Sequence, residues 1–115
     1  MPREIEYTPQ ADVDIDEIAD YFASRTTSVA ARFYQAVYDT AQFLARVSET
    51  SVIGTLYESD DLACQDIRLW QVKGFSKYLI FYRVENSTLK ILRVLHGARD
   101  CQNLVEGENV TQKEK

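Results

Sequence analysis

The chain has 115 residues, of which 45% are hydrophobic and 27% are charged, and its formal net charge is −5. This length suits one domain with a core of its own, and the apolar content excludes a chain that is disordered throughout. The acidic balance excludes a general electrostatic attraction to nucleic acid, and we expect neither a membrane span nor a signal peptide because no apolar run is long enough.

The first part of the chain predicts a short strand and a helix. Residues 3–8 alternate in polarity, which is typical of a strand, and Thr8 and Pro9 suit the cap and first turn of a helix. The spacing of the apolar residues predicts one buried helix face, made of Ala11, Ile15, Ile18, Ala19 and Phe22. The acidic residues near the helix start suit the helix dipole, and we interpret them as charges on a solvated face rather than as a metal site. These residues are Asp12, Asp14, Asp16 and Glu17.

A second amphipathic helix is predicted over residues 29–47, after a short polar break. Two helices joined by so short a turn are expected to form an antiparallel hairpin. Tyr34, Tyr38 and Phe43 lie off the apolar stripe; we expect them to pack at the edge of the core, and the alternative is that they mark a contact surface. Residues 48–66 show no regular pattern and are predicted to form a long loop.

The second half predicts three strands in a meander. The first covers residues 67–72, a turn covers 73–77, and the next two flank a polar break at residues 85–88. Tyr78, Ile80, Tyr82 and Val84 are expected to share one face of the middle strand, and its apolar opposite face predicts a central position. In the last strand we expect one face with Leu89, Ile91 and Leu95 and another with Leu92 and Val94.

This order of elements predicts an α+β fold, namely a two-layer sandwich with the order β-α-α-β-β-β. A four-stranded, mainly antiparallel sheet would pack on the helical hairpin, and the first and second strands would run antiparallel. A short helix is predicted over residues 100–105. The domain therefore covers residues 1–105, and residues 106–115 are expected to be a flexible tail.

The cysteines and glycines argue against several kinds of site. Cys64 and Cys101 form no CxxC motif, so we expect no zinc site and interpret both as reduced thiols of a cytoplasmic protein, with a disulfide between them as the alternative. The four glycines are scattered, which excludes a glycine-rich phosphate loop. His96 is the only histidine, and no nucleophile motif accompanies it, which argues against a Ser–His–acid triad. We expect no cofactor and no metal.

Positive charge is concentrated in residues 67–99, where seven Lys or Arg stand against one acidic residue, Glu85. These residues could bind phosphates or stabilise charge on RNA during cleavage, or they could only decorate solvated strand edges. For Arg93 the structural alternative is a salt bridge to the helical hairpin or to a sheet neighbour, and for His96 it is a structural hydrogen bond. The cluster consists of Arg68, Lys73, Lys77, Arg83, Lys90, Arg93, His96 and Arg99.

The stretches YLIFYRV (residues 78–84) and ILRVLHGARD (residues 91–100) resemble the ParE branch of the ParE/RelE toxins of bacterial type II toxin–antitoxin systems. The resemblance implies a fold with a helical hairpin on a small antiparallel sheet, which agrees with the order derived from the residues. Further matching positions are Ala11, Asp14, Ile15, Ile18, Tyr21, Ala30, Arg32, Phe33 and Arg68.

The resemblance implies one of two activities. ParE-like members inhibit DNA gyrase and are not nucleases, whereas RelE-like members cleave mRNA on the ribosome. The nuclease branch tends to place a basic residue after the tyrosine that Tyr78 matches, where this chain has Leu79, and a Tyr or His near the C-terminus, where residues 102–105 read QNLV. The resemblance therefore favours a gyrase inhibitor.

For a gyrase inhibitor we expect Arg93, His96 and Arg99 to bind the target. As a nuclease, the chain would use Arg68 together with these three residues to bind phosphate and transfer protons. A cognate antitoxin is the implied partner, docked in half-apolar grooves between helices and sheet as part of a hetero-oligomer. The third alternative is a non-toxic binding module with the same fold.

Overall fold

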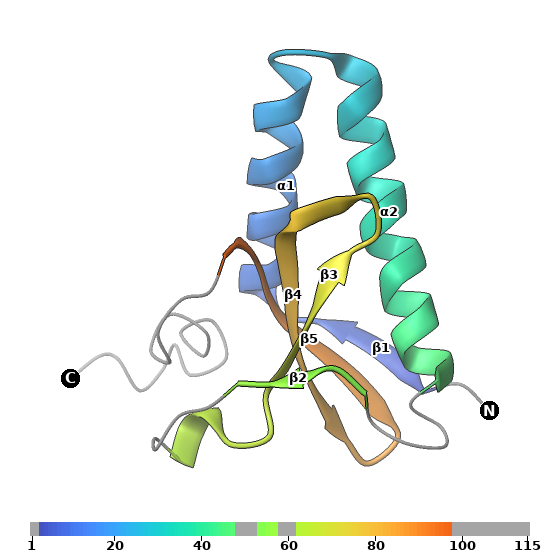
Figure 1. The fold of residues 1–115 in the computed structure, drawn as a ribbon, viewed down its shortest axis with the longest axis vertical. Coiled ribbons are helices and arrows are strands. Elements are labelled where there is room, and N and C mark those ends of the chain that lie inside the picture. The colour runs from blue at the N-terminus through green and yellow to red at the C-terminus, as the bar shows by residue number, and fades with distance from the viewer. Residues whose placement is uncertain (1–2, 48–52, 58–61, 98–115) are drawn as a thin grey trace.

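The chain folds into a twisted sheet that is covered on one face by a pair of helices (Figure 1). The computed structural model describes residues 3–47, 53–57 and 62–97. Within these residues the elements are β1 (Glu4–Tyr7), α1 (Pro9–Ala23), α2 (Thr27–Val47), β2 (Thr55–Leu56), a 3-10 turn η1 (Leu62–Cys64), β3 (Arg68–Val72), β4 (Phe75–Glu85) and β5 (Thr88–His96). The α+β architecture expected from the sequence is confirmed.

The sheet has five strands in the order β1-β5-β4-β3-β2. The prediction of four strands was wrong because the predicted loop over residues 48–66 contains β2, which pairs antiparallel with β3. This extra strand adds one reversal of the chain, so β3 runs in the same direction as β1. The predicted antiparallel relation between the first two predicted strands is therefore also wrong. Instead, β1 pairs in parallel with β5, and the other three pairings are antiparallel.

Helix α1 begins where its sequence predicts. Thr8 is the N-cap, and its Oγ1 accepts a hydrogen bond from the backbone N–H of Ala11 at 3.1 Å. Pro9 occupies the first turn, where a missing N–H costs nothing. The expected apolar face is buried or half-buried. Helix α2 starts at Thr27, two residues before the predicted range.

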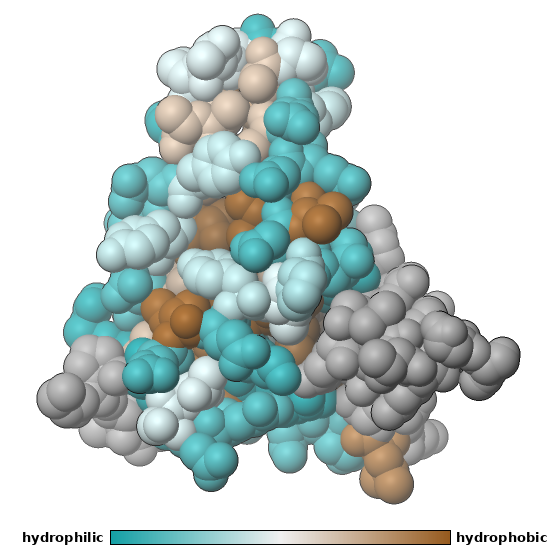
Figure 2. Space-filling model, turned by 180° about the vertical axis from the view of Figure 1, so that it is seen from behind, coloured by the Kyte–Doolittle hydropathy of each residue, from teal (hydrophilic) through white to brown (hydrophobic). Residues whose placement is uncertain are grey.

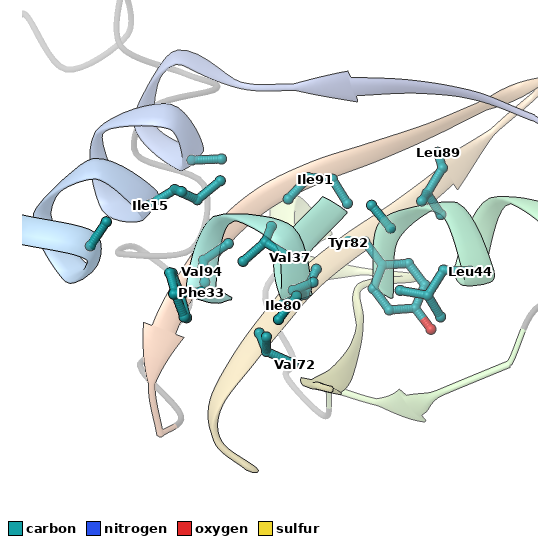
Figure 3. Close-up of a cluster of buried hydrophobic side chains, with 14 of the residues drawn as sticks. Ile15, Phe33, Val37, Leu44, Val72, Ile80, Tyr82, Leu89, Ile91 and Val94 are labelled. Atoms are coloured by element: carbon teal, nitrogen blue, oxygen red, sulfur yellow. The ribbon is translucent and has the colours of Figure 1, made fainter. Parts of the chain in front are cut away.

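The main core lies between the helices and the sheet (Figure 3), where side chains from both layers point toward one another. Phe33 and Leu44 come from α2, and Ile80 and Tyr82 come from β4; all four are at most 1% exposed. The tyrosines expected at the core edge do not pack there, because Tyr34 is 45% exposed and Tyr38 55% exposed. This expectation was wrong for both tyrosines, because positions 34 and 38 lie on the solvent side of α2.

A second, smaller apolar cluster covers the opposite face of the sheet. Phe81 and Leu92 point to this side and pack with Ile67 and Cys64, which lie in the segment before β3. The ring of Tyr57 meets that of Phe81 edge-on, with centroids 6.3 Å apart. The middle strand β4 is thus buried on both faces, as its sequence predicts.

The β4–β5 hairpin departs from regular alternation at one point. Tyr82 lies opposite Ile91 and Phe81 lies opposite Arg93, so Leu92 is an extra residue in β5. This bulge moves Val94 to the helix-covered face and Leu95 to the other face. The predicted faces of these two residues were therefore wrong, because a bulge shifts every later residue by one position.

Several expectations concern residues beyond those described. The predicted helix over residues 100–105 and the tail over residues 106–115 lie outside the described ranges. No helix within those ranges is long and apolar enough to cross a membrane. Of the two cysteines, Cys64 is 1% exposed and disulfide-bonded, which contradicts the expected reduced thiol, and Cys101 lies outside the described residues.

Candidate functional site

Arg93 forms a bidentate ion pair with Asp14 of helix α1. Its Nε donates to Oδ2 at 2.7 Å and its Nη2 donates to Oδ1 at 2.9 Å. The two side chains are only 11% and 5% exposed. The structural alternative predicted for Arg93, a salt bridge to the helical hairpin, is confirmed. The expectation that Asp14 lies on a solvated face was wrong. Its carboxylate is buried, and the bidentate hydrogen bonds of the Arg93 guanidinium compensate for its lost solvation.

Asp14 and Thr8 also complete the outer edge of β5. The pairing with β1 ends at Tyr7, which lies opposite Ile91, and beyond this point β5 needs other partners for its backbone. The Thr8 hydroxyl donates to the carbonyl of Leu92 at 2.8 Å, and the N–H of Val94 donates to Asp14 Oδ2 at 3.1 Å. The start of α1 therefore replaces a strand at this edge.

Arg68 is held at the opposite side of the sheet. Its Nη1 donates to the carbonyl of Gly54 at 3.0 Å, while the neighbouring Tyr82 hydroxyl donates to the carbonyl of Ile53. Burial raises the pKa of Tyr82 to about 12, against the opposing charge of Arg68. Both side chains thus hold Ile53 and Gly54, the two residues before β2, against the sheet.

The structure does not bring Arg68 and Arg93 together. They lie on β3 and β5, which are separated by β4, so their backbones are roughly 10 Å apart. Arg68 reaches toward β2, and Arg93 reaches toward α1. Two members of the predicted basic cluster are therefore tied to opposite edges of the sheet. Of the others, Arg83 lies 3.5 Å from Glu85, and Lys73 and Lys77 are exposed in and after the β3–β4 turn.

His96 ends β5 and is exposed. It lies opposite Tyr78 in the ladder, and the two rings meet edge-on with centroids 5.1 Å apart. Tyr78 in turn packs on Phe22 and Phe33, and burial raises its pKa. The exposed His96 ring therefore rests on Tyr78, which is held in place by the aromatic core. Arg99, which follows shortly after, lies outside the described residues.

The chain turns sharply after this histidine. Gly97 has a φ of 82°, a conformation that favours glycine, and its N–H donates to the carbonyl of Lys77 at 3.2 Å. The strand pairing therefore ends at His96, and Gly97 closes the ladder with this backbone bond. We refer to His96 and Gly97 as the β5 end.

The described site residues differ in exposure. His96 is exposed, whereas Arg68 and Arg93 are half-buried and donate to Gly54 and Asp14. Within the described ranges, no three His, Cys, Asp or Glu side chains gather closely enough to hold a metal ion.

Exposed tyrosines lie on the outer face of the helices, where the sequence left a contact surface open as an alternative to core-edge packing for Tyr34 and Tyr38. Tyr21, Tyr34 and Tyr38 are each at least 45% exposed, and the Tyr34 hydroxyl donates to Asp16 Oδ1 at 2.8 Å. Their positions off the apolar stripe were the available signal. Large aromatic residues that lie off a buried face and are not needed for packing often mark a contact surface.

This chain is similar to a family model of toxins and to a solved structure from a toxin–antitoxin system. Residues 5–101 match the family model described as "ParE toxin of type II toxin-antitoxin system, parDE". Ten chains of solved structures are similar, including one from the chromosomal ParDE TA system from P. aeruginosa. That chain superposes with a TM-score of 0.69 at 18% sequence identity, over 84% of this chain and 97% of that chain. No curated protein matches by sequence.

Proposed function

Since the chain belongs to the ParE toxin family of type II toxin–antitoxin systems, we propose that it acts as a toxin that inhibits DNA gyrase and is neutralised by a cognate antitoxin. The family match over residues 5–101 is the observation that carries this proposal. The activity belongs in the cytoplasm, where gyrase works. The similar P. aeruginosa structure is of a ParDE system, which supports an antitoxin as the partner here.

The state of the basic residues supports inhibition by binding rather than RNA cleavage. A nuclease of this fold would need cations that are available to the scissile phosphate. Arg93 is 11% exposed and fully engaged by Asp14, and Arg68 is bound to the carbonyl of Gly54. Withdrawing Arg93 for catalysis would leave the buried Asp14 carboxylate without its cation. His96, at the β5 end, is the described candidate that a large target can reach.

The test is a supercoiling assay with purified gyrase and relaxed plasmid. We expect the protein to block supercoiling and to increase the amount of cleaved plasmid after detergent and protease treatment. His96→Ala should weaken both effects about tenfold, which is typical of a contact residue at an interface. Arg32→Ala, an exposed change on α2, is the matched control and should behave like the wild type.

Unchanged supercoiling and cleavage at a large molar excess of folded protein would refute gyrase inhibition. The alternative of a ribosome-dependent endoribonuclease is examined in the same preparation, by mapping 5′ ends of ribosome-bound message. Growth arrest with intact message excludes that alternative. Harmless overexpression in a sensitive host would instead identify a non-toxic binding module.

A further inference from the structure

The outer face of the helical pair contains a surface hollow that the proposed function leaves unexplained. Its volume is about 360 Å³, and it lies between the first half of α1 and the middle of α2. Three tyrosines and two aspartates form its walls, namely Tyr7, Tyr34, Tyr38, Asp12 and Asp16. We call this feature the α1–α2 hollow. Figure 2 shows the helical face, on which small hydrophobic patches are separated by a mainly hydrophilic surface.

Two of the three aromatic walls of the α1–α2 hollow are presented to solvent, and the third, Tyr7, is half-buried. Tyr34 is 45% exposed and Tyr38 is 55% exposed, while Ile15 and Val37 below them belong to the core. The hydrogen bond from the Tyr34 hydroxyl to Asp16 Oδ1 fixes the ring against α1 and leaves Oδ2 available as an acceptor. The hollow therefore has a rigid apolar floor and exposed ring faces.

The charge of the hollow is negative. Helix α1 carries five acidic residues and no basic residue, and among the residues that the structure describes only Asp14 of these five pairs with a cation, Arg93. Neither Asp12 nor Asp16 has an ion pair within the described ranges, and none of the residues that line the hollow is basic. Burial and the charge of Asp12 raise the pKa of Tyr7, as expected where the potential is negative.

We propose that the α1–α2 hollow binds the side chain of an arginine, supplied by a basic segment of the antitoxin. The identity of the partner rests on the proposed function, whereas the recognition of a cation rests on the hollow itself. Aromatic faces attract a cation through their quadrupoles, and paired carboxylates accept the forked donors of a guanidinium. A cation–π contact of this kind already occurs within the chain: the guanidinium carbon of Arg25 lies 4.7 Å from the centre of the Tyr21 ring.

The first test uses a defined probe and the whole protein labelled with ¹⁵N. N-acetyl-arginine amide is titrated into the protein, and N-acetyl-citrulline amide, which has nearly the same shape and no charge, is the matched probe. We expect saturable amide shifts at Tyr7, Tyr34 and Tyr38 with arginine alone, and about tenfold weaker binding in the Asp12→Asn/Asp16→Asn variant. Equal shifts with citrulline, or shifts confined to other parts of the protein, would overturn the proposal.

The second test measures the affinity of the purified antitoxin for variants of the hollow. Tyr38→Ala and Asp12→Asn should each weaken binding about tenfold, while Tyr21→Ala, an equally exposed tyrosine outside the hollow, should have no effect. If the wild type binds the antitoxin and the hollow variants bind equally well, this inference fails and the proposed function stands. If the wild type does not bind the antitoxin, the proposed pairing fails, and the arginine titration still decides on cation binding.

Discussion

Asp14 is the residue on which the junction of helix and sheet depends. Its two oxygens accept bonds from the guanidinium of Arg93 and from the backbone N–H of Val94, so one carboxylate joins α1 to β5. The pair is almost completely buried, and a buried cation that loses its partner retains the whole cost of its desolvation. Asp16, two residues further along α1 and on its exposed side, accepts a hydrogen bond from the hydroxyl of Tyr34.

Asp14→Asn should therefore lower the free energy of unfolding by about 3 kcal/mol, although it preserves the shape of the side chain. Asp16→Asn, the same chemical change at an exposed position, should alter stability by less than about 0.5 kcal/mol. Urea unfolding followed by circular dichroism measures both values. Equal, small losses for the two variants would mean that Arg93 is solvated and that the ion pair does not stabilise the junction.

At the scale of elements, Gly54 determines where β2 begins. Its φ of 107° turns the chain away from β3, so that pairing begins only at Thr55. A methyl group at this position would lie 2.0 Å from the hydroxyl oxygen of Tyr82 and 3.1 Å from the carbonyl oxygen of Leu69. The approach is close because the Tyr82 hydroxyl donates to the preceding residue, Ile53.

Gly54→Ala should destabilise the protein more than Gly74→Ala does. Both glycines have positive φ, but a methyl group on Gly74 meets nothing within 4 Å, so that variant pays only the backbone strain of about 1 kcal/mol. At Gly54 the rigid, buried ring of Tyr82 must move as well, and we expect a loss of about 3 kcal/mol. Thermal unfolding compares the two, and a Gly54 variant as stable as the Gly74 variant would contradict the close packing.

At the scale of the whole molecule, the rigid centre and the recognition surfaces are separate. Strands β4 and β5 form the longest pairing, and β4 has neighbours on both edges and apolar clusters on both faces. The β5 end and the α1–α2 hollow lie outside this centre. Both are nevertheless joined to it. His96 pairs with Tyr78 of β4, and α1 carries Asp12 and Asp16 of the hollow on its outer side and Asp14, which binds Arg93 of β5, on its inner side.

This arrangement predicts a gradient of hydrogen exchange. The amides of β4 between Leu79 and Tyr82 should exchange only by global unfolding, whereas those of β2 should open locally with a much smaller free energy. The reason is that β2 has two residues, both exposed, and a single neighbouring strand. Exchange measured by NMR at several denaturant concentrations distinguishes the two kinds of opening. Equal protection of β2 and β4 would refute the gradient.

The sequence by itself determined the features that depend on near neighbours. The cap at Thr8, the apolar stripes of both helices and the polar break before Thr88 each involve a few consecutive residues, so caps, spacing and turn residues were sufficient to predict them. The same holds for the central position of β4, whose residues are apolar on both faces. The charge-rich end of β5 could likewise be singled out as a candidate surface, but not the contacts that its residues make.

Only the tertiary structure decided which distant groups meet. Asp14 and Arg93 are 79 residues apart, and the sequence around each of them does not identify the other as its partner. The parallel pairing of β1 with β5 and the presence of the two-residue β2 likewise arise from contacts across the sheet. The α1–α2 hollow needs side chains from one strand and two helices. Periodicity assigns a residue to a face, but the partner on that face depends on how the whole chain packs.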